Sequence, residues 1–160
     1  MISPLYAANN MIRRAREQGV NLTNLKLQKL LYLLYTKYYF DTGDSLFPDR
    51  FEAWQYGPVL TEIYDIFKIE GSKPIVDLRP DANGEVLIIS ETGIFGECFD
   101  YVWSNYARQG AANLVDLTHG DEKSEYKTAW RIAYDESPGK FLIDDNIKKD
   151  GEEWFARSNN

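Results

Sequence analysis

LKLQKLLYLLYTKYYF, residues 25–40, is the most strongly patterned stretch of this chain. Its apolar side chains recur at helical spacing, and they form two stripes rather than one. A helix that carries apolar residues on two sides is buried on two sides. We therefore expect a central helix from about Thr23 to Phe40, with the rest of the chain packed around it. The first stripe is Leu27, Leu30, Leu31, Leu34 and Tyr38, and the second is Leu25, Leu33 and Phe40.

Further helices are predicted on both sides of this stretch. Ser3-Pro4 has the form of an N-cap followed by a first helical residue, and Gly19 ends that helix. Gly57-Pro58 is expected to start another helix, since proline is tolerated in the first turn, where its missing N–H costs nothing. The remaining expected helices cover residues 92–109, residues 111–118, a segment capped by Ser124, and a segment from Asp144 that Gly151 interrupts or weakens.

Strands are expected in small number. Residues 73–78 and 85–90 are rich in β-branched side chains, and Asn83-Gly84 between them predicts a hairpin turn. Residues 51–56 alternate weakly and fit a short strand or an extended entry to the next helix. The predicted class is α+β and mainly α: one compact helical domain over residues 1–160, with a central buried helix and a small β-hairpin or sheet packed on it.

Composition limits the possible functions. The 160 residues include 18 Lys and Arg against 25 Asp and Glu, a formal net charge of −7. Nucleic-acid binders usually carry a basic excess, so the charge argues against that role and suits a basic partner. No apolar run approaches the roughly 20 residues that span a bilayer, and the N-terminus lacks the features of a secretion signal. We expect a cytoplasmic protein without a membrane anchor.

The inventory of catalytic residue types is small. The chain has one histidine, His119, and one cysteine, Cys98, so a structural zinc site is excluded, and no nucleotide-binding motif is present. Cys98 lies on the apolar face of its helix, which favours a core role over a Cys98–His119 pair. His119 follows a short helix, where an imidazole can cap carbonyls or pair with an acid. We expect no cofactor, no metal and no enzyme activity.

The stretch FEAWQYGPV, residues 51–59, is the best candidate for a binding surface. Alternation along an extended segment would place Glu52, Trp54 and Tyr56 on one side. Exposed Trp and Tyr side chains often anchor protein–protein interfaces. A structural role for Glu52, such as pairing with Lys26 or Lys29, is favoured over catalysis, because no second acid is positioned beside it.

Four stretches in order resemble a known family over roughly residues 4–155. They are LKLQKLLYLLYTKYYF, FEAWQYGPVLTEIYDIFK, FKIEGSKPI and LVDLTHGDEKSEYKTAW. The resemblance is to the Panacea domain, also described as the SocA-like antitoxin or phage-associated GepA-like domain. It implies an antitoxin of a bacterial or phage toxin–antitoxin pair that neutralises its toxin by direct binding.

The family resemblance also implies partners and residue roles. The partners are a cognate toxin, expected to be the product of the adjacent gene, and a cytosolic protease in an adaptor branch; a homo-oligomer is possible. Some family members carry an added DNA-binding segment, and none is expected here. The candidate partner-binding residues are Glu52, Trp54, Tyr56, His119, Tyr32 and Lys29. The motif residues with an expected structural role are Leu27, Gln28, Leu30, Gly57, Pro58, Tyr64 and Trp130.

Two alternatives remain open from the sequence. A DNA-binding regulatory protein of a phage or mobile element would use Arg13, Arg14 and Arg16 on phosphates, with the predicted hairpin as a wing. A hydrolase would depend on Glu52 or Cys98.

Overall fold

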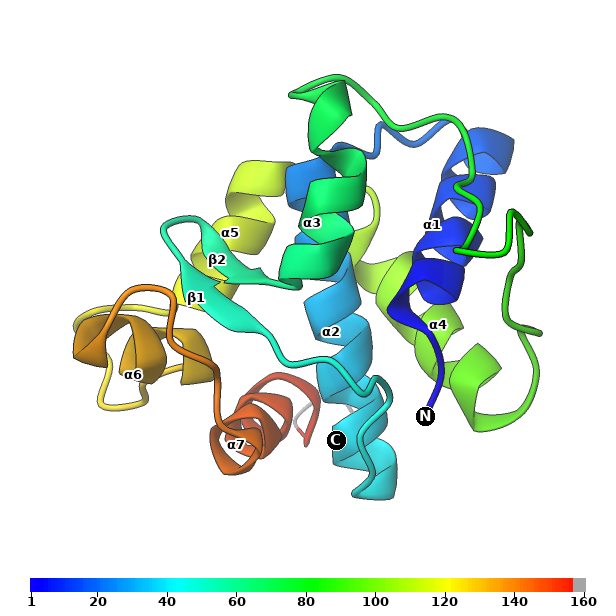
Figure 1. The fold of residues 1–160 in the computed structure, drawn as a ribbon. Coiled ribbons are helices and arrows are strands. Elements are labelled where there is room, and N and C mark those ends of the chain that lie inside the picture. The colour runs from blue at the N-terminus through cyan, green and yellow to red at the C-terminus, as the bar shows by residue number, and fades with distance from the viewer. Residues whose placement is uncertain (157–160) are drawn as a thin grey trace.

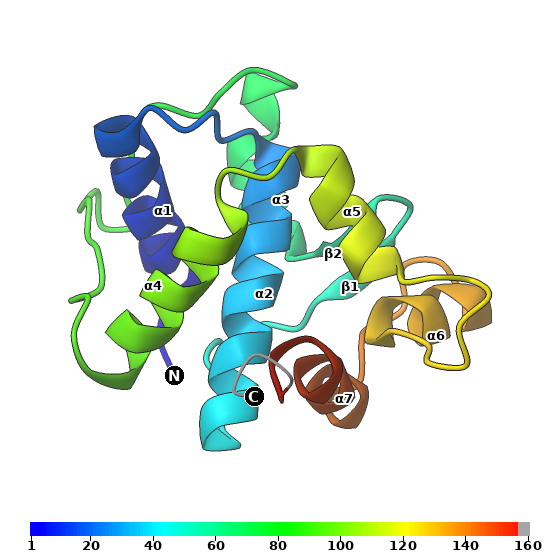
Figure 2. The same ribbon diagram turned by 180° about the vertical axis from the view of Figure 1, so that it is seen from behind.

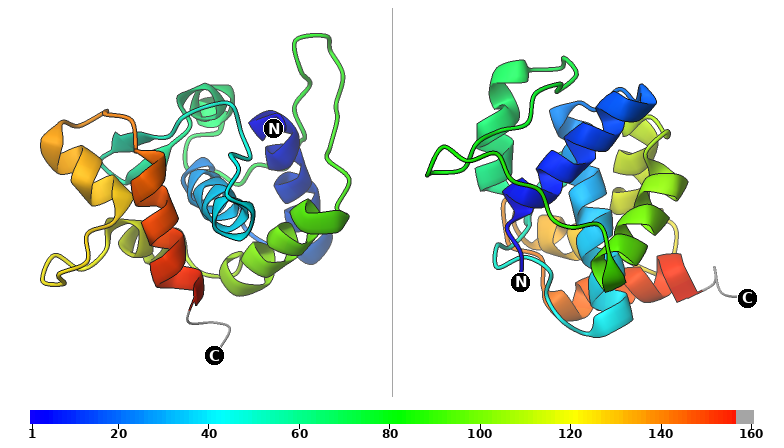
Figure 3. Two further views of the ribbon diagram at one scale, coloured as in Figure 1. Left: turned by 90° about the horizontal axis from the view of Figure 1, so that it is seen from below. Right: turned by 90° about the vertical axis from the view of Figure 1, so that its right-hand side faces the viewer.

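The structure, a computed structural model, describes residues 1–156 and has one helix at its centre. This helix is α2 (Asn24–Thr42), and Figure 1 shows it running through the middle of the molecule. Seen end-on in the left part of Figure 3, α2 lies inside a ring of other elements. The predicted central helix and the mainly helical class with a small sheet are confirmed. The helices that contact α2 are α1 (Pro4–Gln18), α3 (Thr61–Phe67), α4 (Gly93–Tyr106), α5 (Ala111–His119) and α7 (Asp144–Phe155).

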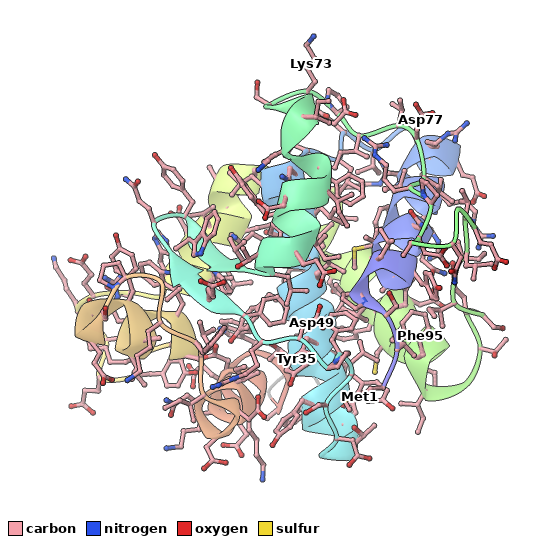
Figure 4. All side chains as sticks on the ribbon, viewed as in Figure 1. Met1, Tyr35, Asp49, Lys73, Asp77 and Phe95 are labelled. Carbon is pink, nitrogen blue, oxygen red and sulfur yellow. The ribbon has the colours of Figure 1, made fainter. Side chains whose placement is uncertain are left out.

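The apolar stripes of α2 form the core. Leu27, Leu30, Leu31 and Leu34 of the first stripe have no exposed surface, and Leu33 of the second stripe is equally buried. Burial on all sides follows from the position of α2 between the layers, and Figure 4 shows side chains filling the spaces between the ribbons.

The sheet of the described chain is a two-stranded antiparallel hairpin. It consists of β1 (Glu52–Trp54) and β2 (Gly57–Val59), with Ala53 opposite Pro58. The prediction that Gly57-Pro58 starts a helix is therefore wrong, and α3 begins only at Thr61. Gly57 has a φ of +110°, which is outside the helical region.

Pro58 is tolerated in this strand because Ala53, the residue opposite it, makes its backbone hydrogen bonds elsewhere. The backbone N–H of Ala53 donates to Lys140 and its carbonyl accepts from Gly139, at 2.8 Å and 2.7 Å. Ala53 thus uses its hydrogen-bonding groups on the outer side of β1, and no N–H is required from the residue that faces it across the hairpin.

The hairpin predicted around Asn83-Gly84 is only half present. Gly84 has a φ of +80° and a turn forms, with the Asp81 N–H donating to Glu85 at 2.8 Å. The flanking segments form no strands in the described structure. Instead they lie along α1, where the buried side chains of Asn9 and Asn10 bind their backbone.

Asn9 and Asn10 replace a partner strand. The Asn9 amide accepts from the Arg79 N–H at 2.9 Å and donates to the Arg79 and Leu87 carbonyls at 3.0 Å. The Asn10 amide accepts from the Ile89 N–H at 2.8 Å and donates to its carbonyl at 2.7 Å. Backbone groups that would have paired in a sheet are satisfied by side chains of a helix, so the sheet does not form.

The C-terminal part differs in detail from the expectation. The helix α6 (Ala129–Glu136) is capped by the Thr128 hydroxyl, which accepts from the Arg131 N–H, rather than by Ser124. The helix α7 continues through Gly151, and glycine fits there because a Cβ would lie only 2.8 Å from the Cβ of Phe40. A short 3-10 helix, η1 (Lys68–Glu70), follows α3 and leads into the loop that carries Lys73 at the top of Figure 4.

Candidate functional site

Lys29 fastens the hairpin to the central helix. Its side chain is 0% exposed, and its Nζ donates to the Pro58 carbonyl at 2.8 Å. Burial lowers the pKa of Lys29 to about 7, because a charged ammonium is poorly solvated there. A Cβ on Gly57 would lie 2.6 Å from Lys29 Cε and 2.8 Å from Thr118 Oγ1. Glycine is therefore required at position 57, because any side chain there would block Lys29 from reaching the Pro58 carbonyl.

Gln28 makes a second connection from the same helix. Its amide oxygen accepts from the Leu60 N–H at 3.0 Å, and its amide nitrogen donates to Asn24 at 3.0 Å. Leu60 is the residue before α3 and provides no side-chain cap. Gln28 thus satisfies a buried backbone group at the junction between β2 and α3.

Trp130 supports the hairpin from the opposite face. Its indole N–H donates to the Trp54 carbonyl at 2.6 Å. The His119 ring stacks on Trp130 with a centroid distance of 3.8 Å, and the Arg131 guanidinium lies 5.0 Å from the Trp130 ring centroid. Burial and the nearby Arg131 lower the pKa of His119, which favours a neutral ring. His119 therefore lies behind the hairpin, packed against Trp130.

Asp150 joins three helices in the interior. It accepts hydrogen bonds from the hydroxyls of Tyr32, at 2.6 Å, and Tyr126, and from the Ala129 N–H at 3.1 Å. Burial raises the pKa of Asp150 to about 6, and the hydrogen bonds from Tyr126, Tyr32 and Ala129 partly oppose that rise. Tyr32 itself has no exposed surface. It belongs to this buried network.

A groove lies in front of the hairpin, between β1–β2, α3 and the start of α2. It has a volume of about 650 Å³, and its lining includes Leu25, Trp54, Tyr56, Val59 and Tyr64. Trp54 and Tyr64 meet edge to face at a centroid distance of 4.9 Å. Tyr56 is 58% exposed at the hairpin turn. We call this the aromatic groove. Its rigid Trp–Tyr wall and exposed Tyr have the properties of an interface anchor.

Glu52 lies on β1 but does not line the aromatic groove. Its carboxylate accepts a hydrogen bond from the Thr61 hydroxyl at the start of α3. Its backbone pairs with Phe141 in an isolated bridge. No ion pair joins Glu52 to Lys26 or Lys29 within residues 1–156. The Thr61 hydroxyl is the partner of the Glu52 carboxylate, in place of the expected lysine.

Most residues of the alternative sites predicted from the sequence make other contacts, whereas Arg16 is exposed. Arg13 and Arg14 both pair with Glu91, and Arg14 also pairs with Asp100 at 3.0 Å. Burial raises the pKa of Cys98 to about 12, and its thiol donates to Asp41. Within residues 1–156 no group of three His, Cys, Asp or Glu is placed to hold a metal ion, and no helix is long and apolar enough to cross a membrane.

Comparison with known proteins places the chain in a family. Residues 27–124 match the family described as Antitoxin SocA-like, Panacea domain. The chain belongs to this family. It is also 32% identical over 117 residues to Antitoxin SocA of Caulobacter vibrioides (strain NA1000 / CB15N), covering 70% of this chain and 62% of the relative. The chain thus spans less than two thirds of that relative's length. No solved structure matches it.

The motif residues of this Panacea domain are mostly internal. Gln28, Lys29, Gly57 and Pro58 form the contacts that hold the hairpin on α2, and Tyr32 binds Asp150. Of the six candidate contact residues, the structure brings only Trp54 and Tyr56 together in the groove. It places Lys29 and Tyr32 in the core, His119 against Trp130, and Glu52 against Thr61.

Several organising residues were not found by sequence reasoning. Asp150 stands in the string DDNIKKDGEE, which reads as a solvated acidic run, and only the 3.6-residue spacing from Ile147 to Asp150 and Gly151 marks an inward face. Asn9 and Asn10 lie on the inner face of α1. The only sequence feature that indicates their burial is the pair of small residues before them, Ala7 and Ala8.

Proposed function

We propose that this chain is an antitoxin that neutralises a cognate toxin by direct binding, and that the toxin docks in the aromatic groove. Membership of the Panacea family supports the general role. The observation that carries the site is the pairing of the exposed Tyr56 with the fixed Trp54–Tyr64 wall on one open surface. Aromatic anchors on a rigid support lose little entropy when they are buried by a partner.

The construction of the hairpin explains why this surface is suited to binding. Lys29, Gln28 and Trp130 fix the hairpin and its junction with α3 through the Pro58, Leu60 and Trp54 backbone. The groove is therefore formed before any partner arrives, which lowers the cost of association. The excess of acidic residues, a net charge of −7, would favour approach of a toxin with a basic surface.

The role needs no catalytic step by this chain. Cys98 is held as a protonated thiol in the core, and the buried groups Lys29 and Asp150 have structural partners. The proposal places the protein in the cytoplasm and gives it a toxin, encoded by the adjacent gene, as its partner.

Co-expression tests the proposal. The product of the adjacent gene is expected to arrest growth alone and to become harmless when this chain is made with it. Tyr56→Ala and Trp54→Ala should each lower affinity for the toxin roughly thirtyfold or more, because burying such an anchor is worth about 2 kcal/mol. Ile94→Ala, an equally exposed residue at the start of α4, is the matched control and should bind normally.

Two results would count against this assignment. An adjacent product that is harmless alone, or toxic in the presence of this chain, removes the antitoxin role as stated. If Tyr56→Ala and Trp54→Ala both bind the toxin with full affinity, the aromatic groove is not the toxin-binding site. The half-life of the toxin in cells separates occlusion, in which the toxin persists, from delivery to a cytosolic protease, in which its half-life shortens when the antitoxin is present.

A further inference from the structure

A second cavity lies behind the aromatic groove, between two connecting segments. One is the α1–α2 connection and the other is the α4–α5 connection, and Figure 2 shows the two near each other in the upper half of the molecule. The cavity has a volume of about 340 Å³ and falls in the lower range of small-molecule sites. None of its lining residues is acidic, although the chain has 25 Asp and Glu. The lining consists of Gly19, Val20, Asn21, Thr23, Lys26, Arg108, Gln109, Gly110 and Ala111.

Lys26 is the first cation of this cavity. The residue is only 6% exposed, and its side chain lines the cavity. Within the described chain its ammonium group has no hydrogen-bond acceptor and no ion-pair partner. Its backbone N–H is already bound by the Thr23 hydroxyl at 3.3 Å, which leaves only the side chain facing the space. The stem of Lys26 is thus buried, while its unpaired ammonium group is open to the cavity, where an anion can pair with it.

Arg108 is the second cation. It is an exposed residue that lines the same cavity from the α4–α5 connection, and no carboxylate in residues 1–156 pairs with it. Burial and the repulsion from Arg108 together lower the pKa of Lys26. In a protein with net charge −7, two unpaired cations that line one cavity are an arrangement that an anion would stabilise.

The start of α5 adds a third positive element. The helix α5 has Gly110 as its N-cap, with no side-chain cap and no acidic residue in its first turn. The N–H groups of Ala111 and Ala112 find no acceptor within the described residues, whereas Asn113 and Leu114 donate to the Gly110 carbonyl at 3.1 Å and 3.2 Å. Helix N-termini with unpaired N–H groups attract anions through the partial positive charge of the helix dipole.

We propose that this cavity binds a phosphate group, carried by free phosphate or by a small phosphomonoester. Two full positive charges and a helix N-terminus match a dianion better than a single carboxylate. Guanidinium and ammonium groups both bind phosphate oxygens, and the uncapped N–H groups can donate to a third oxygen. The site adjoins the aromatic groove at Thr23 and Ala111, which line both spaces, but it uses none of the groove's aromatic residues.

Titration of the full chain with inorganic phosphate, and separately with glycerol phosphate, tests the site. Calorimetry at constant ionic strength should show saturable binding, and amide NMR should show shifts at Ala111 and Ala112. Lys26→Met and Arg108→Gln should each weaken binding roughly tenfold or more. Lys148→Gln, an exposed lysine on α7, is the control and should bind as the wild type does. Tighter binding of glycerol phosphate identifies an organic ligand, and equal binding identifies phosphate itself.

The site is overturned if neither compound binds at millimolar concentration, or if binding persists unchanged in both variants. Chloride at the same ionic strength should leave the Ala111 and Ala112 shifts unchanged, and an equal response to chloride also overturns it, because the effect would then be general screening. If Lys26→Met fails to fold, Arg108→Gln and the wild-type amide shifts decide the question. None of these measurements involves a toxin, so their failure leaves the antitoxin proposal untouched.

Discussion

The side-chain nitrogen of Lys29 lies 2.8 Å from the carbonyl oxygen of Pro58, and this contact joins the central helix to the strand behind the aromatic groove. The lysine is fully buried, and it reaches Pro58 only because Gly57 has no side chain. The glycine at position 57 is thus explained by the space that the Lys29 side chain needs, and not by the start of a helix.

Gly57→Ala is expected to destabilise the fold strongly. Alanine is strained at a φ of +110°, and its Cβ would lie 2.6 Å from Lys29 Cε. Strain of about 1–2 kcal/mol and overpacking of about 1–3 kcal/mol should both lower the free energy of unfolding. Gly43→Ala, with a φ of +77° and nothing within 4 Å of its Cβ, isolates the strain. Equal losses in urea unfolding of the two variants would refute the packing role of Gly57.

Lys29→Met should change how stability depends on pH. The pKa of Lys29 is depressed in the folded state, to about 7 from 10.5. Its contribution to stability is therefore full above pH 10.5 and is lost as the pH falls through about 7. Between pH 7 and 10, the free energy of unfolding of the wild type should rise relative to that of the variant by roughly 1 kcal/mol per pH unit. Lys148→Met, on the exposed face of α7, should follow the wild type. Parallel curves for the wild type and Lys29→Met would show that the amine is not desolvated.

Asp150→Asn should have the opposite pH signature. The pKa of Asp150 is raised in the folded state, to about 6 from 3.8. Its contribution to stability is fully present below pH 3.8 and is lost as the pH rises through about 6. The wild type should therefore lose about 2 kcal/mol relative to the variant between pH 4 and 7. Urea unfolding across this range measures the difference, with Asp145→Asn, an exposed residue of the same helix, as the control. A constant difference would contradict the buried carboxylate.

Asn9→Ala should release the loop between η1 and α4 from α1. The Asn9 amide makes three hydrogen bonds with Arg79 and Leu87, and their loss should cost about 1 kcal/mol each, because the backbone groups of Arg79 and Leu87 are only partly buried. We expect faster proteolysis between residues 79 and 90, detected by mass spectrometry of early fragments. Asn113→Ala, on the exposed side of α5, should be cleaved at the wild-type rate. Unchanged cleavage in Asn9→Ala would mean that the loop is held by other contacts.

The sequence was sufficient for the features that depend on neighbouring residues. The two stripes of residues 25–40, the Ser3-Pro4 start and the buried position of Cys98 follow from local periodicity and capping. The family followed from short motifs in order. In the candidate site, alternation along residues 51–56 pointed to Trp54 and Tyr56, which line the groove, and also to Glu52, which does not.

Only the tertiary structure decided where the strands and the buried charges are. Residues 85–90 have the local preference of a strand, yet Asn9 and Asn10, far away in the sequence, take up their backbone groups. Gly57-Pro58 fits a helix start locally, but the arrival of Lys29 selects a strand. Tertiary structure also places Lys26 of α2 and Arg108 of the α4–α5 connection in the lining of one cavity, although they are far apart in the sequence. Local patterns fix which conformations a segment prefers, whereas contacts between remote segments fix which hydrogen bonds and charges are satisfied, and these contacts cannot be read from neighbouring residues.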